Sequence, residues 1–297
     1  MPTRLTAAQR RVLAWASRDG RDLPWRRTRD PWSVLVSEVM LQQTQVTRVV
    51  PAWTAFLERF PTPAACADAT LGDVITAWAG MGYNRRAVNL HGCATALALD
   101  HDGRVPCDLA QLQRLPGIGP YTARAVLVFA FEQPVGVVDV NAARVHARLA
   151  GRRLTSVEVQ SRADDATPPD RPWAWNQAVL DLGATVCTKR APKCGTCPLT
   201  HDCEWRRVGN IDPDPAENSA FIPARQSAFA GSDRQGRGRL VDALRRGPVD
   251  GTPSNLAAVM GWPDDAERSM RVAMSVVAHG LAEWAQDDQV LCLPKFA

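Results

Sequence analysis

The sequence predicts an all-α fold that ends in a small module of mixed structure. Apolar residues recur at helical spacing through most of the 297 residues, and strand patterns are almost absent before the C-terminal end. The composition, 45% hydrophobic and 22% charged, is ordinary for a globular protein with a sizeable core. No run approaches about 18 uninterrupted apolar residues, so we expect no membrane span.

The first third of the chain is predicted to be a series of helices. Residues 5–19 alternate arginine with apolar residues and lack the continuous apolar core of a signal peptide, so we expect a cytoplasmic protein. Asp30 and Pro31 mark the next helix start, because proline is tolerated where no donor is needed. Helical spacing predicts helices at residues 32–41, 51–60, 71–79 and 85–99.

A single carboxylate lies inside the helix predicted at residues 32–41. Glu38 is placed between Val36 and Met40, among apolar neighbours. Such surroundings disfavour the charged form of a carboxyl group, which suits a general acid. The alternative is a glutamate on the solvent side of a surface helix, which the residues alone leave open.

Two segments after this helix carry side chains that suit a nucleic acid. The amides of Gln42, Gln43 and Gln45 can donate to and accept from base edges, although on a plain helix they would only be solvated. The segment GMGYNRR predicts a tight loop that presents Met81 and Tyr83 beside two arginines. An exposed pair of this kind fits a wedge inserted into a duplex, and packing into the core is the alternative.

The run LPGIGPYTARAVLVFAFEQPVGVVDVN organises the middle of the chain. It predicts a helix, a tight turn at Pro116, Gly117 and Gly119, and a second helix from Tyr121 to Phe131. The first N–H groups of that second helix have no partner within the helix. They form a natural seat for one DNA phosphate, and such a contact positions the backbone without reading sequence.

A second acid follows at the end of the same run. Pro134 and Gly136 end the helix, so Asp139 is predicted at the N-cap of the next helix with Asn141 just inside it. This places a carboxylate near the bound backbone. The alternative is a plain αα-hairpin with an ordinary capping aspartate.

The remaining segments are assigned by pattern. We predict a helix at residues 142–151, a polar, proline-rich loop at 152–172, a helix at 173–187 and a linker at 206–228. GRGRLVDALRRG, PSNLAAVMGW and DDAERSMRVAMSVVAHG predict three helices, and LAEWAQDDQVLCL predicts a hairpin that turns at Asp287 and Asp288. Three helices and a hairpin indicate a small winged-helix-like module.

Four of the eight cysteines form one short cluster, Cys187, Cys194, Cys197 and Cys203. The spacing Cys-x6-Cys-x2-Cys-x5-Cys suits either tetrahedral zinc or a 4Fe-4S cluster. Zinc ribbons usually pair two close knuckles, whereas only one Cys-x2-Cys knuckle is present, so the spacing favours the cluster. Lys189, Arg190 and Lys193 lie between the first two cysteines and predict a phosphate clamp.

Five motifs in this order resemble a known family. LPWR, DPWSVLVSEVMLQQTQV, LPGIGPYT, VVDVN and the cysteine spacing after LDLGATVC resemble the helix-hairpin-helix DNA glycosylases with an iron–sulfur cluster, and most closely the MutY-type adenine DNA glycosylases. The resemblance covers roughly residues 5–205. It implies an iron–sulfur lobe at 1–24 and 136–205 and a six-helix barrel with the helix-hairpin-helix at 25–135, followed by the linker at 206–228 and the module at 229–297.

The family's functional positions carry over residue by residue. Glu38 matches the acid that protonates adenine, and Asp139 matches the carboxylate that stabilises the sugar cation, with Tyr121 and Asn141 as supports. Positions around the flipped adenine are Trp25, Arg26, Leu41 and Gln177, and those entering the duplex beside 8-oxoguanine are Gln43, Met81 and Tyr83. The further expected DNA contacts are Gln42, Pro116, Gly117, Ile118, Gly119, Lys189 and Lys193. The expected cluster ligands are Cys187, Cys194, Cys197 and Cys203.

One position indicates which reaction the family scaffold performs. Bifunctional relatives that resemble endonuclease III use a lysine where this chain has Tyr121, and no lysine precedes Thr188. We therefore expect a monofunctional glycosylase. Val140 departs from the family pattern, which often has glycine there, and a β-branched residue restricts the backbone.

The resemblance implies a monomeric, nucleoid-associated base-excision repair enzyme that acts on double-stranded DNA with adenine opposite 8-oxoguanine or guanine. The module is too short for the Nudix-like domain of many MutY proteins, so Phe229 and Ser232 are candidate 8-oxoguanine contacts. From Arg225 onward the chain has nine basic and nine acidic residues, which leaves open a module that touches no DNA. The alternative functions are a mismatch thymine or uracil glycosylase and a non-catalytic iron–sulfur DNA-binding regulator.

Overall fold

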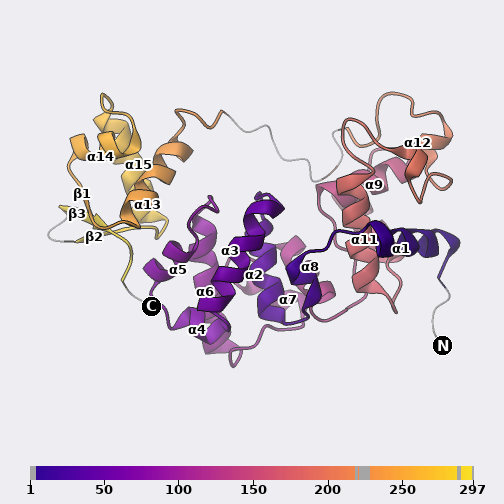
Figure 1. Cartoon of the computed structure of the whole chain (residues 1–297), viewed down its shortest axis with the longest axis horizontal. Coiled ribbons are helices and arrows are strands. Elements are labelled where there is room, and N and C mark those ends of the chain that lie inside the picture. Colours follow the sequence, from indigo (N-terminus) through magenta and orange to yellow (C-terminus); the bar gives the residue numbers. More distant parts are fainter. Residues whose placement is uncertain (1–4, 218–219, 221–227, 286–288, 296–297) are drawn as a thin grey trace. The chain divides into compact units, whose positions relative to one another are not determined.

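The computed structural model describes residues 5–217, 220, 228–285 and 289–295, and most of them are helical (Figure 1). The chain forms two compact units. Unit 1 comprises Met1–Val34, Cys107–Ala110 and Gly119–Ala224, and unit 2 comprises Leu35–Pro106, Gln111–Ile118 and Arg225–Ala297. Across the described ranges, the helices are too short or too polar to cross a membrane. The predicted domain boundaries stay a prediction.

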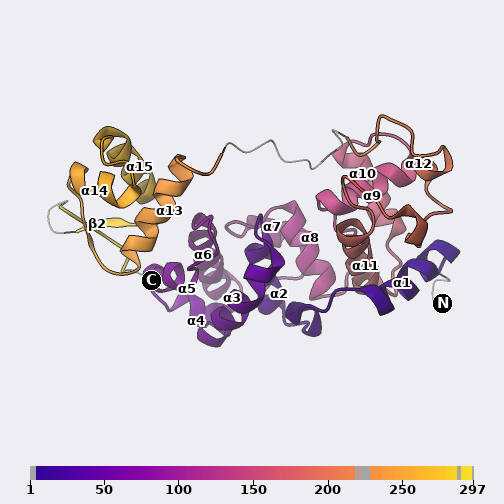
Figure 2. The same cartoon turned by 45° about the horizontal axis from the view of Figure 1, so that its top comes forward.

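Unit 1 is built around helices α1, α9, α10 and α11 (Figure 2). Their apolar faces meet in one core that includes Val12, Ala142, Val159 and Leu182. Its elements are α1 Ala7–Asp19, η1 Pro24–Arg27, α8 Pro120–Phe129, α9 Val140–Ala150, α10 Ser156–Ala166, α11 Pro172–Thr185, η2 Cys194–Thr196 and α12 Glu204–Arg207.

The segment predicted to be a loop at residues 152–172 is partly helical, so that prediction was wrong. Helix α10 occupies Ser156–Ala166, and its first turn is closed by a capping box. The Thr155 side chain accepts from the Glu158 amide, and the Glu158 carboxylate accepts from the Thr155 amide. This reciprocal cap stabilises a helix whose composition is otherwise polar.

The helices of unit 2 surround Phe56 and Trp78, whose rings meet edge to face at 6.1 Å between centroids. The elements are α3 Val46–Arg59, α4 Pro63–Ala67, α5 Leu71–Ala77 and α6 Arg85–Asp100. Two further helices begin in unit 1 and end in unit 2, α2 Pro31–Leu41 and α7 Leu109–Arg114. Helix α3 starts five residues before the predicted position, and the short α4 was not predicted.

The C-terminal module contains the three predicted helices and the predicted hairpin. In chain order its elements are α13 Asp233–Leu244, β1 Val249–Asp250, α14 Pro253–Met260, α15 Ala266–Ala278, β2 Glu283–Ala285 and β3 Val290–Cys292. Strand β1 was not predicted, and it completes an antiparallel sheet of order β1-β3-β2. The predicted turn at Asp287 and Asp288 lies outside the described residues.

The module packs against helices of unit 2. The Gly72 amide donates to the Pro294 carbonyl at 2.9 Å, and a Cβ at Gly72 would come within 2.7 Å of that oxygen. Arg245, the C-cap of α13, donates from Nε to the Ile75 carbonyl at 3.1 Å. The module is therefore joined to α5 by backbone contacts that tolerate little change.

Candidate active site

Asp139 is the N-cap of α9, as the sequence predicts. One carboxylate oxygen accepts from the amides of Asn141 at 2.8 Å and Ala142 at 2.7 Å, and the other accepts from Asn141 Nδ2 at 2.8 Å. Three donors and the positive end of a helix thus hold the carboxylate in one orientation. An acid fixed in this way can stabilise a developing positive charge.

Asn141 is in turn held by Arg144, one turn further along α9. Arg144 Nη2 donates to Asn141 Oδ1 at 2.8 Å and to the Gly183 carbonyl at 2.6 Å, and Nε donates to the Cys187 carbonyl at 2.7 Å. Gly183 of α11 lies against the Asn141 backbone, where an added Cβ would come within 2.7 Å of the Asn141 oxygen. A chain of direct contacts therefore links Asp139 to the first cysteine of the cluster.

The four clustered cysteines line one cavity of about 30 Å³. Burial, together with the three other thiols that lie close by, raises the pKa of Cys197 to about 11. Within the ranges that the structure describes, no three Cys, His, Asp or Glu side chains are placed to hold a single metal ion. The four cysteine side chains therefore converge on one small cavity.

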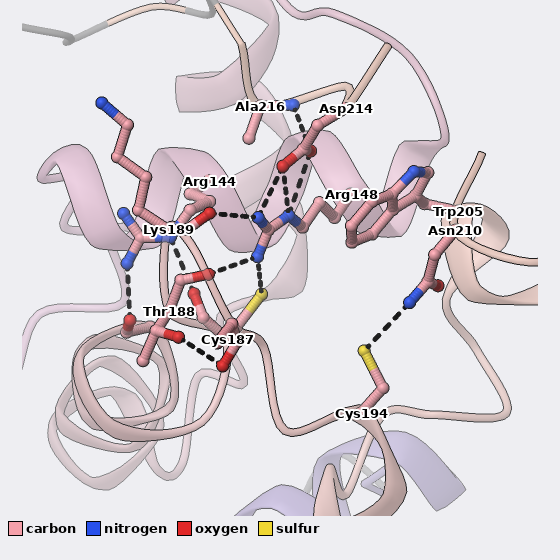
Figure 3. A network of polar contacts seen from close by, with 12 residues as sticks. Arg144, Arg148, Cys187, Thr188, Lys189, Cys194, Trp205, Asn210, Asp214 and Ala216 are labelled. Carbon is pink, nitrogen blue, oxygen red and sulfur yellow. Dashed lines mark hydrogen bonds and ion pairs between the residues drawn. The ribbon is translucent and has the colours of Figure 1, made fainter. Parts of the chain in front are cut away.

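Arg148 connects this cavity to the segment that follows it (Figure 3). Its Nη1 donates to Cys187 Sγ at 3.3 Å and to the Thr188 carbonyl at 2.8 Å, while Nη2 and Nε bond the Asp214 carboxylate. The guanidinium lies 4.7 Å from the Trp205 ring centroid. Burial lowers the pKa of Arg148, but the bonds to Asp214 and Cys187 outweigh it and leave that pKa above its ordinary value.

Asn210 makes a similar contact with the second cysteine. Its Nδ2 donates to Cys194 Sγ at 3.6 Å. Donors to cysteine sulfur are the contacts that tune thiolate-bound metal centres. Lys189 and Lys193 are both exposed on the same loop.

Glu38 lies on α2 in unit 2 and is only 5% exposed, as predicted. Leu35, Val39 and Met40 around it are all buried. The carbonyls at the end of α2 accept hydrogen bonds from a buried arginine of α6 that was not predicted to have this role. Arg86 donates from Nη1 to the carbonyls of Val39, Met40 and Gln42 at 2.7–2.9 Å.

Arg86 also holds the GMGYNRR loop. Its Nη2 donates to Thr44 Oγ1 at 2.9 Å and to the carbonyls of Met81 and Gly82 at 3.2 and 3.1 Å. Arg86 was expected to lie beside an exposed wedge, but it is buried. It donates to both segments that carry the predicted duplex-entering residues, the one after α2 and the GMGYNRR loop. A cation at these helix-end carbonyls satisfies acceptors that have no partner in the helix.

The expected exposed pair is half correct. Tyr83 is 43% exposed, whereas Met81 is buried at 2% and packs as a core residue. Gln43 is exposed, and Gln43 and Tyr83 both have positive φ values, 54° and 46°. Non-glycine residues seldom adopt this region, and such strain is concentrated at functional positions.

The residues expected around the adenine lie in different settings. Trp25 and Gln177 are buried in unit 1, and Leu41 is half-buried at the end of α2. Arg26 forms two bonds of 2.7 Å to Asp181, whose pKa stays below its usual value despite burial because of Arg26 and Arg21. Their roles at a base stay predictions.

The predicted phosphate-binding turn is tight. Pro116, Gly117 and Gly119 are exposed, and Ile118 is buried at 5%. Gly117 has φ +77°, and a Cβ there would come within 2.7 Å of Asn89 on α6. Tyr121, half-buried, lies in the first turn of α8.

Comparison with known proteins identifies the family. Residues 36–168 match the model of the HhH-GPD superfamily base excision DNA repair proteins. An adenine DNA glycosylase of Mycobacterium tuberculosis is 44% identical over 277 residues, which cover 91% of this chain and 88% of the relative. The chain belongs to the adenine DNA glycosylase family. The Mycolicibacterium smegmatis member is also 44% identical, over 93% of this chain and 92% of its own.

Solved structures extend the likeness to other members of the fold. A thermostable thymine-DNA glycosylase matches with TM-score 0.63 and 28% identity, over 67% of this chain and 95% of its own. An endonuclease III–DNA covalent intermediate matches with TM-score 0.59 and 26% identity, over 70% and 100%. Identity to the adenine DNA glycosylases is clearly higher than to either of these.

Proposed function

We propose that this chain is a monofunctional glycosylase of base-excision repair, which hydrolyses the N-glycosidic bond of adenine paired with 8-oxoguanine or guanine. The observation that carries the proposal is the Asp139 carboxylate, oriented at the N-cap of α9 by the backbone and by Asn141. Membership of the adenine DNA glycosylase family supports the choice of base.

The two acids have different tasks in this reaction. The target nucleotide is first flipped out of the duplex. Glu38 transfers its proton to N7 of adenine, so that the C1′–N9 bond breaks with its electron pair going to the purine. Asp139 stabilises the oxocarbenium ion left on the sugar, and Glu38 then accepts a proton from the water that adds to C1′.

Strand cleavage is not part of the proposed reaction. A lyase step needs an amine to form a Schiff base, and the residue at the corresponding position is Tyr121. Incubation with an A:8-oxoguanine duplex and borohydride should therefore trap no covalent complex. Efficient trapping would show a bifunctional enzyme instead.

We further propose that Cys187, Cys194, Cys197 and Cys203 hold a 4Fe-4S cluster. Four thiols lining one cavity, with donors from Arg148 and Asn210 to two sulfurs, support this assignment. Zinc ribbons usually pair two close Cys-x2-Cys knuckles, whereas this loop has a single knuckle, Cys194 and Cys197, and that spacing favours the cluster over zinc. These four cysteines would hold the cluster, and ligation there would order the loop on which Lys189 and Lys193 are exposed as candidate DNA contacts.

A base-release panel tests the proposed function. Duplexes with A:8-oxoguanine, A:G, T:G and U:G are incubated with the whole chain at neutral pH, and the free base is identified. We expect adenine from the first two only. Release of thymine or uracil would favour the mismatch glycosylase alternative that the thymine-DNA glycosylase likeness suggests, and binding without release would favour a regulator.

A further inference from the structure

A cluster of positive side chains joins the C-terminal module to helix α6 in unit 2. Arg85 begins α6, Arg237 lies on α13, and His279 follows the end of α15. Burial lowers the pKa of both Arg237 and His279, and the nearby charge of Arg85 lowers each further. Three cationic or potentially cationic groups from three helices therefore lie within electrostatic reach of one another.

Direct contacts hold these helices together at this place. Arg245, which caps α13 about two turns after Arg237, donates from Nη2 to Asn84 Oδ1 at 3.0 Å. Gly280, next to His279, lies against α6, where an added Cβ would be 3.4 Å from Val88 Cγ1. Val88 is one turn from Arg85, so the two share a face of α6.

The hydrogen bonds within the cluster leave donors available. Arg237 donates to Ser275 Oγ and, at 2.9 Å, to His279 Nδ1. A guanidinium has no acceptor, so Nδ1 must accept and the neutral ring carries its proton on Nε2. His279 Nε2 and the remaining N–H groups of Arg237 are therefore donors.

Acidic groups do not neutralise the cluster. Asp233 is the acid that acts on Arg237, and it is already paired with Arg268 at 2.7 Å. In the parts of the chain that the structure describes, neither Arg85 nor Arg237 forms an ion pair. The first turn of α6 contains no acidic residue, so its positive end adds to the same field.

We propose that Arg85, Arg237 and His279 bind one backbone phosphate of the DNA duplex. This proposal deepens the proposed glycosylase function and rests on it for the identity of the ligand. Phosphate oxygens accept from guanidinium and imidazole N–H groups with strong charge-assisted bonds. Tyr83, two residues before Arg85, is a predicted duplex-entering residue, so a phosphate held here would fix the backbone beside it. The C-terminal module thereby becomes part of the DNA-binding surface despite its formal neutrality.

The test compares R85Q, R237Q and the double variant with R246Q in the full-length protein. Arg246 is an exposed arginine of the same module outside the cluster, so its replacement removes the same charge. Binding to an undamaged duplex is measured by fluorescence anisotropy over a range of KCl concentrations. The slope of log affinity against log salt is negative, and losing one phosphate contact should make it shallower by about 0.9. The same loss should weaken binding at low salt by about tenfold.

Both single variants should show this loss, and the double variant should lose little more, because the two arginines share one phosphate. R246Q should keep the wild-type slope. If R85Q and R237Q bind with the slope and affinity of R246Q, the proposal is overturned. Arg85 is exposed, so its result does not depend on the folding of the module.

Two further arms separate the possible failures. Inorganic phosphate is titrated against the wild type and R237Q; phosphate binding that R237Q abolishes, together with an unchanged DNA slope, would assign the cluster to free phosphate and overturn the proposal. Adenine release by the wild type is measured separately. If adenine is released but both variants bind like R246Q, only the phosphate site is overturned, whereas absence of release would contradict the proposed function itself.

Discussion

Two buried arginines, Arg148 in unit 1 and Arg86 in unit 2, are stabilised in different ways. Arg148 is paired with the Asp214 carboxylate and lies over an aromatic ring. Arg86 also lies over aromatic rings, those of Trp78 and Tyr83, but it donates to neutral oxygens, and burial lowers its pKa to about 10. It is still charged at neutral pH. In unit 1 the charge of Arg148 is neutralised by Asp214, and the pair holds the cysteine loop in place. In unit 2 the charge of Arg86 is not neutralised by a carboxylate of the described residues, so a positive charge lies beneath the predicted duplex-entering residues.

The largest expected effect comes from breaking the balanced pair. Replacing Arg148 by Met leaves the Asp214 carboxylate without its ion-pair partner and removes the donor to Cys187. Removing one partner of a buried ion pair costs about 3–5 kcal/mol, so we expect a loss of this size in the free energy of unfolding of the holo-protein. Chemical denaturation measures it.

A matched surface pair serves as the control. Arg152 and Glu158 form an ion pair of 2.8 Å between exposed side chains. Such pairs contribute about 0–1 kcal/mol, so Arg152→Met should change stability little. Equal losses for the two substitutions would show that burial does not separate the pairs.

Removing the unbalanced charge should have the next largest effect. Arg86→Met leaves helix-end and loop carbonyls without their donor, and a buried unsatisfied group costs about 1–3 kcal/mol. We expect a loss near the upper end of that range, together with weaker binding of duplex DNA. Arg86→Lys keeps the charge but lacks the fork of donors, and should recover only part of the stability. Full recovery by lysine would mean that charge alone matters.

The contact between α11 and α9 should affect the rate more than the stability. In Gly183→Ala the new Cβ meets the backbone of Asn141. A small displacement of the group that orients Asp139 should slow adenine release by about 10–100-fold. Single-turnover kinetics measure this. Gly238→Ala, at a glycine of α13 with nothing within 4 Å, is the control and should keep the wild-type rate.

The last effect is negligible at neutral pH and is a pH dependence of the stability of unit 1 in acid. Burial, and then the nearby Arg162, lower the pKa of His146 from 6.5 to about 4. The unfolded chain therefore binds a proton below about pH 6.5 that the folded chain does not accept until about pH 4. As the pH is lowered from about 6.5 to about 4, the free energy of unfolding should therefore fall by about 1.4 kcal/mol per pH unit. His146→Gln should flatten that slope, and an unchanged slope would show that another group titrates.

The sequence predicts local features of both regions well. Asp139 is a predictable N-cap because Pro134 and Gly136 end the preceding helix nearby, and Glu38 is predictable as buried from its apolar neighbours. The capping box at Thr155 and Glu158 was also readable, but the polar, proline-rich composition around it obscured the helix.

Long-range contacts could not be predicted in the same way. Arg86 reaches carbonyls more than 40 residues away, and Arg144 and Arg148 reach the cysteine loop from about the same separation. The only local signal for Arg144 and Arg148 is that they lie one turn apart on a predicted helix. Such a pair more often marks the solvent-exposed face of a helix. Met81 shows the reverse case, because a glycine-flanked methionine in a loop packs into the core.

The measurement that tests the account most directly is single-turnover adenine release by Asp139→Asn. The amide keeps the size of the side chain but removes the charge that faces the sugar cation. We expect the variant to bind the A:8-oxoguanine duplex with near wild-type affinity and to release adenine at least about 100-fold more slowly. Release at the wild-type rate would contradict the assignment of Asp139 as the catalytic carboxylate.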